Sequence, residues 1–226
     1  MAKRPIFMPR TDEIGVRTIE IDFEWFPGFS LAQKQKSVSA MHQAFAEANN
    51  VSRCLEVSSK SEEALGKALS AFNLQLVADN NVSRSVEVLF QGSKVFSNGG
   101  PYNDLYEGSS LEAKRDPRLK TSGQLTAFEY QRETWELVPT TGFYDYLYSS
   151  ALLSNPELIE GLEMFSAFSD IEFNPSRSLN CQAMAVARFR SLAFHKALDL
   201  IRGEQRLFLE QSFNDCVGLE EQQSLF

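Results

Sequence analysis

The chain has 226 residues, of which 43% are hydrophobic and 23% are charged, and its formal net charge is −8. This composition predicts a soluble globular chain with one domain, or one domain with an extension, and excludes a disordered chain. No apolar run approaches the ~20 residues of a membrane span, and no secretory signal follows the basic N-terminus, so we expect a cytoplasmic protein. The acidic balance argues against non-specific nucleic-acid binding, but it is compatible with a local basic strip.

Cysteine and histidine form no pattern typical of a metal site or a disulfide framework. The three cysteines, Cys54, Cys181 and Cys216, are widely spaced and odd in number, so we expect reduced thiols. The two histidines, His42 and His195, each lie in a predicted helical stretch without a second ligand at metal-binding spacing. We therefore expect ordinary helix-surface histidines, no metal and no cofactor. Nucleotide-binding and serine-hydrolase motifs are not found in the sequence either.

The first 53 residues predict an extended segment followed by a helix. Residues 1–28 read as extended, because Ile19–Phe23 alternates apolar and polar side chains. Ser30 is a suitable N-cap for a helix over residues 31–48. The apolar face of this helix consists of Leu31, Val38, Met41 and Phe45. Shorter elements follow, which we expect to be a strand over residues 54–58, a helix over 62–69 and a strand over 74–77.

Ser85–Phe96 predicts a helix around which the rest of the chain is organised. Ser85 is a suitable N-cap, and Glu87 falls in the first turn, where the helix dipole favours a carboxylate. Gln91 and Lys94 return to nearly the same side as Glu87, with Lys94 roughly 10 Å further along the axis. This polar stripe is either a solvated face, which the spacing alone favours, or a pocket wall with an acid and an amine.

Basic residues gather after this helix, and helices dominate the last third of the chain. The cluster consists of Lys114, Arg115, Arg118 and Lys120, and it is either a solubilising surface or a phosphate contact. A short helical piece over residues 111–115 and a strand over 125–130 are expected in this region. The later helices are expected over residues 143–153, from Pro156, over 178–201 and after Gly203, with a break at 168–175.

Several segments, in order along the chain, resemble the NADAR (YbiA-like) family. Leu69–Asn73 resembles the family's L-S-N-F motif, with Ala71 in place of the asparagine. Ser85–Glu87 and Phe90–Lys94 resemble its S-V-E and F-Q-A-x-K motifs.

Further matches follow this central pair of motifs, and the resemblance covers about residues 55–190. They are Ala113–Arg115 with the family's A-(K/R)-x-x-G-R, Trp135 with a family tryptophan, Asp170 with the aspartate of E-x-x-x-D-x-x-W-G, and Asn180 with the asparagine of G-x-N-x-L-G. Phe173-Asn174 stands where the family has W-G. Four segments resemble the branch encoded beside DarT-type DNA ADP-ribosyltransferase toxins: residues 3–7, 33–36, 99–106 and 170–175.

The resemblance implies a fold of the α+β class, mainly α-helical, with a few short strands in a YbiA/NADAR-like single domain. Residues 1–53 are then an N-terminal strand–helix extension packed on the core. Residues 54–202 form the NADAR-like catalytic domain, and residues 203–226 form a C-terminal helix and tail.

The resemblance also implies a function. Members of the toxin-linked branch remove ADP-ribose from guanine in DNA, so the chain resembles an ADP-ribosylguanine glycohydrolase that acts as an antitoxin. The implied partners are guanine-ADP-ribosylated single-stranded DNA, or ADP-ribose, and a cognate DarT-type toxin, with no membrane and no cofactor. Two alternatives stay open: a small-molecule N-glycosidase of riboflavin-pathway intermediates, and a non-catalytic antitoxin that binds ADP-ribose.

Three residues are the catalytic candidates that the family motifs imply: Glu87, Lys94 and Asp170. Glu87 is expected to face the ribose as positive charge develops there. Lys94 either attacks the anomeric carbon as a neutral amine or acts electrostatically, with Lys60 as a second amine candidate. The implied ADP-ribose contacts are Ser70, Phe72, Asn73, Gln91, Lys114, Arg115, Arg118, Trp135 and Asn180. Among these, Arg115 or Arg118 would hold the diphosphate and Trp135 would stack on adenine or the target base.

Overall fold

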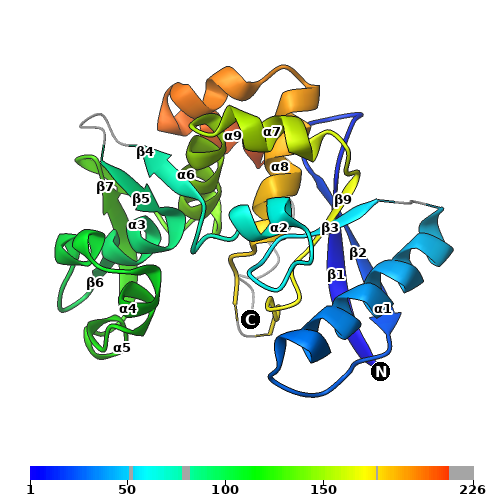
Figure 1. Cartoon of the computed structure of the whole chain (residues 1–226). Coiled ribbons are helices and arrows are strands. Elements are labelled where there is room, and N and C mark those ends of the chain that lie inside the picture. Colours follow the sequence, from blue (N-terminus) through cyan, green and yellow to red (C-terminus); the bar gives the residue numbers. More distant parts are fainter. Residues whose placement is uncertain (51–52, 78–81, 177, 214–226) are drawn as a thin grey trace, which may run out of the picture. The chain divides into compact units, whose positions relative to one another are not determined.

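The computed structural model describes residues 1–50, 53–77, 82–176 and 178–213. Cys216 and residues 214–226 of the predicted tail lie outside the described residues. The chain divides into two compact units, which Figure 1 shows in sequence colours. Unit 1 comprises Met1–Ser70 and Pro156–Phe226, and unit 2 comprises Ala71–Asn155.

Unit 1 contains a four-stranded sheet that pairs three N-terminal strands with one strand from residues 167–169. Its strands, in spatial order, are β2 (Val16–Phe23), β1 (Ala2–Pro9), β9 (Ala167–Ser169) and β3 (Cys54–Glu56). β1 and β2 form an antiparallel hairpin, whereas β9 runs antiparallel to β1 and parallel to β3. The predicted extended segment is thus confirmed as a hairpin, and the predicted strand at residues 54–58 is confirmed in its first half. Strand β9 falls in the predicted break, and its three residues are too few to show a periodicity.

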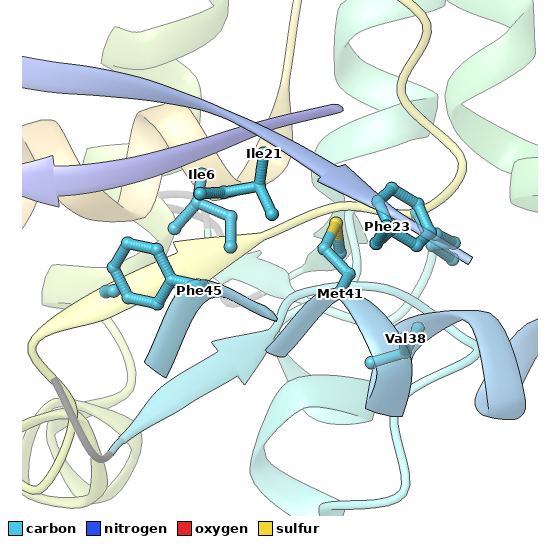
Figure 2. Close-up of a cluster of buried hydrophobic side chains, with 8 residues drawn as sticks. Ile6, Ile21, Phe23, Val38, Met41 and Phe45 are labelled. Atoms are coloured by element: carbon cyan, nitrogen blue, oxygen red, sulfur yellow. The ribbon is translucent and has the colours of Figure 1, made fainter. Parts of the chain in front are cut away.

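Helix α1 (Leu31–Asn49) packs its apolar face against this sheet. The hydroxyl of Ser30 accepts a hydrogen bond from the backbone N–H of Gln33, which confirms the predicted N-cap. Figure 2 shows the resulting core cluster, in which the α1 side chains lie against those of β1 and β2. The labelled members are Ile6, Ile21, Phe23, Val38, Met41 and Phe45. Leu31 was expected on the same face but is half exposed, because it lies in the first turn, beyond the sheet.

The remaining helices of unit 1 come mostly from the C-terminal part of the chain. They are α2 (Ala64–Ala68), α7 (Pro156–Leu162), α8 (Gln182–Phe194), the 3-10 helix η2 (Leu198–Arg202) and α9 (Gln205–Ser212). Helix α8 packs against β1 and β9. The single helix predicted over residues 178–201 is wrong, since α8 ends at Phe194 and the backbone of Lys196 is left-handed, with φ at 55°.

Unit 2 combines two small sheets with short helices. Its strands are β4 (Gln75–Val77), β5 (Ser83–Ser85), β6 (Lys94–Phe96), β7 (Leu125–Tyr130) and β8 (Glu133–Trp135). β4 pairs with β5, and the other three form a sheet in the order β6-β7-β8. Its helices are α3 (Val86–Gly92), the 3-10 helix η1 (Asn103–Glu107), α4 (Ser110–Arg115), α5 (Arg118–Thr121) and α6 (Gly142–Leu153).

The α+β class predicted from the sequence is confirmed by this mixture of helices and short strands. The two compact units divide the chain near residues 70 and 155, whereas the expected parts divide it near residues 53 and 202. Within unit 1, strand β1 of the first 53 residues pairs directly with β9. Within the described part of the chain, helices are all too short or too polar to span a membrane.

Candidate active site

Helix α3 is buried along its whole length. Ser85 caps it through its hydroxyl, which accepts from the backbone N–H of Val88, as predicted. The helix stops at Gly92, where a Cβ would collide with the ring of Tyr106, so only glycine allows this close approach. The prediction of one helix up to Phe96 is therefore wrong, and Lys94 begins strand β6 instead.

The three polar residues of the expected stripe still meet, although they are not on one helical face. The Gln91 Nε2 donates to Glu87 Oε1 over 2.9 Å, and Lys94 Nζ donates to Gln91 Oε1 over 2.8 Å. Glu87 is 6% exposed and Gln91 is 7% exposed. The solvated-face interpretation is thus wrong, and unit 2 holds a buried acid–amide–amine chain, defined here as Glu87–Gln91–Lys94.

Two amines flank the carboxylate of this chain. Lys114 Nζ lies 3.8 Å from Glu87 Oε1 and 4.8 Å from the ring centroid of Phe72. Lys94 Nζ lies 4.8 Å from the ring centroid of Phe90. Burial lowers the pKa of Lys94, with Glu87 opposing this shift and Lys114 adding to it. Lys94 is therefore the amine that is predisposed to lose its proton, while the half-exposed Lys114 is the counter-ion of Glu87.

The arginines of the basic cluster differ in whether their charge is already neutralised. Arg118 Nη2 lies 2.6 Å from Asp104 Oδ2 and 2.9 Å from Asp116 Oδ2, and these carboxylates raise the pKa of Arg118. Its guanidinium also covers the ring of Tyr102, at 4.4 Å from the centroid. Arg115 is exposed at the end of α4, and within the described ranges it makes no ion pair. Of the two candidates for a phosphate contact, Arg115 is the one whose charge is available.

Trp135 does not fit the stacking role expected for it. It is 1% exposed and lies in an aromatic core, with ring centroids 5.4 Å from Phe143 and 4.4 Å from Tyr146. Both contacts use ring surface that a base would need. Its indole N–H is buried, and no hydrogen-bond acceptor for it is found among the described residues. Trp135 is thus a core residue of unit 2.

Asp170, the third catalytic candidate, lies in unit 1 directly after β9. Its Oδ1 accepts from the backbone N–H groups of Glu172 and Phe173, and its Oδ2 accepts from Gln182 Nε2. Asp170 is 6% exposed, and burial raises its pKa to about 6 against the stabilising effect of these donors. The adjacent Glu172 carboxylate adds to the rise and is itself paired with Lys34 over 3.0 Å.

The remaining candidates are distributed over both units. Asn180 precedes α8, and its buried Oδ1 has no hydrogen-bond donor in the described part of the chain. Lys60 Nζ donates to the hydroxyl of Ser59. Ser70 is buried in unit 1, whereas Asn73 is exposed in unit 2.

The sequence did not indicate a functional role for two residues near Asp170, Glu56 and His42. Glu56 is 2% exposed at the end of β3, and burial followed by the charge of Asp170 raises its pKa to about 8. The signal in the sequence is an acid between two apolar residues, Leu55 and Val57, which are both fully buried. His42 was expected on a helix surface but is half-buried, with Nε2 2.7 Å from the hydroxyl of Ser169, and burial lowers its pKa to about 4.

The mixed α+β fold agrees with the resemblance to NADAR proteins. Residues 2–222 match the family model described as DarT1-associated NADAR antitoxin, and the chain belongs to this family. Its role at this level is that of an antitoxin associated with DarT1. The match begins at residue 2, so the N-terminal hairpin and α1 are part of the family pattern rather than an addition to it. A search of curated proteins found no match.

Proposed function

We propose that the protein removes ADP-ribose from guanine in DNA by cleaving the N-glycosidic bond, and thereby reverses the action of a DarT-type toxin. The observation that carries this proposal is the Glu87–Gln91–Lys94 chain, with its buried carboxylate and an amine of lowered pKa. Membership of an antitoxin family supports the biological direction of the reaction.

Glu87 is the group proposed to face the ribose. Breaking a C–N glycosidic bond develops positive charge on the sugar and negative charge on the leaving base. A carboxylate in a largely water-free setting stabilises such a cation more strongly than a carboxylate in water. Gln91 fixes the direction of Glu87 by donating to one oxygen, so the carboxylate needs little reorganisation during the reaction.

Lys94 is proposed to act as the nucleophile. Its neutral Nζ attacks the anomeric carbon, a new C–N bond forms, and the bond to the guanine nitrogen breaks as that nitrogen takes a proton. The attached Nζ then loses a proton to solvent and the ribose ring opens, which gives a Schiff base between Lys94 and the anomeric carbon. Water then replaces the amine, which frees ADP-ribose and regenerates Lys94. Lys114 supports this role, because it balances the charge of Glu87 and lowers the pKa of Lys94.

Asp170 and Arg115 complete the proposed set. The raised pKa of Asp170 suits a general acid for the leaving base, since a catalytic acid works best with a pKa near the operating pH. Arg115 is proposed to contact the diphosphate, because guanidinium groups bind phosphate oxygens in a bidentate manner.

The test uses single-stranded DNA that carries ADP-ribosylated guanine. Wild-type protein is expected to release ADP-ribose and leave unmodified DNA. Glu87→Gln is expected to bind the modified DNA but to release no ADP-ribose from it. The matched control is Glu136→Gln, which changes an exposed acid of the same unit. Binding without release by the wild type would indicate a non-catalytic antitoxin. Release of base only from small N-ribosides would indicate a small-molecule N-glycosidase.

A further inference from the structure

Glu56 is a buried acid that the proposed reaction does not use. It lies at the end of β3 in unit 1, with Leu55 and Val57 fully buried on either side. Its Oε1 accepts from the Ser58 hydroxyl over 2.6 Å and from the backbone N–H of Ile171 over 2.9 Å. Through Ile171, Glu56 therefore holds the residue that directly follows Asp170.

The second oxygen of Glu56 begins a chain of hydrogen bonds to helix α1. Glu56 Oε2 lies 2.6 Å from the Ser169 hydroxyl, which lies 2.7 Å from Nε2 of His42. The Ser169 hydroxyl also forms a hydrogen bond with the Cys54 thiol; burial raises the pKa of this thiol, so the thiol keeps its proton and can donate it. The one proton of the Ser169 hydroxyl is then donated either to Glu56 or to His42. When Glu56 is charged, Ser169 donates to it and His42 must donate from Nε2. When Glu56 is protonated, the acid donates to Ser169, which donates to an unprotonated Nε2.

The charged and titratable groups around Glu56 favour the protonated form. Asp170 follows β9, Cys54 lies on β3, and Cys181 precedes α8. Glu172, which acts on Asp170, is paired with Lys34 of α1. His42 is neutral near pH 7, because burial lowers its pKa to about 4. Among the described residues, no ammonium or guanidinium group neutralises Glu56.

Oxygen Oε2 is the position for the proton. Oε1 already receives two donors, one of which is a backbone N–H that cannot turn away. Oε2 contacts only the Ser169 hydroxyl, which can reverse its direction. Asp170 has no such reversible partner among the described residues. Its two oxygens accept from N–H groups, and N–H donors favour the carboxylate form.

We propose that Glu56 is a positioning residue for Asp170, which near neutral pH carries a proton on Oε2, donates it to Ser169 and so fixes the segment Ser169–Ile171. This role rests on the proposed function, because it matters for catalysis only if Asp170 acts on the substrate. Loss of the proton places a second negative charge in the same buried cluster and reverses the hydrogen bonds to His42. Activity is therefore expected to fall when Glu56 ionises.

The first test reads the tautomer of His42 and needs no substrate. In the full chain, ¹⁵N NMR is expected to show an unprotonated Nε2 at pH 7 and a protonated Nε2 above the ionisation near pH 8. Glu56→Gln keeps Oε1 as an acceptor and places an N–H donor at Ser169, so His42 is expected to stay in the neutral-pH tautomer throughout. His195→Gln assigns the signals, since the chain contains two histidines.

The second test compares the pH profiles of ADP-ribose release, each normalised to its own value at pH 7. The rate is expected to fall first as Asp170 loses its proton above about pH 6, in both the wild type and Glu56→Gln. The wild type is expected to show a second, steeper fall above the ionisation of Glu56, and Glu56→Gln is expected to lack only this second fall. Glu157→Gln, an exposed acid of unit 1, is the control and should behave like the wild type. Alanine at position 56 cannot accept the hydrogen bond from Ile171, so Glu56→Ala should release ADP-ribose slowly at every pH. Glu56→Gln, which can accept this bond, should release ADP-ribose faster than Glu56→Ala.

The two tests fail in different ways. A His42 tautomer that does not change with pH, or that changes equally in Glu56→Gln, would overturn the protonated state of Glu56. A second fall, above the ionisation of Glu56, that persists in Glu56→Gln would overturn its link to Asp170. Wild-type protein that releases no ADP-ribose at any pH would overturn the proposed function and the catalytic role of Glu56, while the tautomer would still report its protonation.

Discussion

The two acids proposed for catalysis are equally buried but differently neutralised. Glu87 and Asp170 are each 6% exposed. Glu87 in unit 2 has the ammonium of Lys114 3.8 Å away and accepts from an amide. Asp170 in unit 1 has only neutral N–H donors, and a second acid, Glu56, lies in the same cluster.

Glu87 has an ammonium close to its carboxylate, whereas none of the described residues gives Asp170 an ion pair, and burial raises the pKa of Asp170. Unit 2 is therefore suited to stabilising a developing cation and unit 1 to holding a proton. The predictions below test this division, beginning with the largest expected effect.

Replacing Glu87 by Gln should lower ADP-ribose release by about 10²–10⁴-fold, because the charge that faces the ribose is lost. Thermal stability should change little, since an ion pair with a half-exposed lysine contributes only about 0.2–1 kcal/mol. Rates under single-turnover conditions and thermal unfolding measure the two effects. A rate within a factor of two of the wild type would remove Glu87 from the reaction.

Asp170→Asn should also lower release, but it should stabilise the fold at neutral pH. The pKa of Asp170 rises on folding from 3.8 to about 6, so the unfolded chain ionises first as the pH increases. As the pH increases from about 4 to 6, the free energy of unfolding of the wild type therefore decreases by at most ~3 kcal/mol, and the variant avoids this decrease. Denaturant unfolding at pH 4 and pH 7 measures the difference. A variant less stable than the wild type at both pH values would contradict the account.

Lys114→Gln should shift the acidic limb of the activity profile to higher pH. Burial lowers the pKa of Lys94 and Lys114 adds to this shift, so removal of Lys114 leaves less neutral amine at pH 7 and should slow release. Activity should recover as the pH increases. Lys120→Gln is the matched control, since Lys120 is an exposed lysine of the same unit. An unshifted limb in Lys114→Gln would argue for a purely electrostatic Lys94.

Arg115→Gln should weaken substrate binding by about threefold to tenfold without changing the rate at saturation. Arg118→Gln should have a smaller effect on binding, because Asp104 and Asp116 already neutralise its charge. Titration of both variants with ADP-ribose compares them. Equal losses would show that Arg118 exchanges its carboxylate partners for phosphate.

Local signals in the sequence predict several elements of this fold correctly. The Ser30 and Ser85 caps and the strand Leu125–Tyr130 depend on nearby residues, and all three are confirmed. Strand β6 was predicted as the end of a helix and β9 lies mostly in a predicted break, and both pair with strands that are distant in the sequence.

The sequence indicated which residues belong to the candidate site, but it did not predict which contacts they make. The family motifs indicated Glu87, Gln91 and Lys94, yet helical spacing gave the wrong reason for their proximity, because Gly92 ends the helix. Glu56 and His42 could not be predicted, since they meet only through strand β9 and Ser169. Burial of Trp135 depends on the packing of α6 against β8, which a single tryptophan does not reveal.

Borohydride trapping on guanine-ADP-ribosylated single-stranded DNA tests most directly whether the Glu87–Gln91–Lys94 chain performs the reaction. We expect a reduced covalent adduct of ADP-ribose, which peptide mass spectrometry should assign to Lys94. Lys94→Arg should abolish both this adduct and the activity. The Lys120→Gln control should form the same adduct as the wild type. Full release of ADP-ribose by Lys94→Arg, with no adduct on the wild-type protein, would contradict the account.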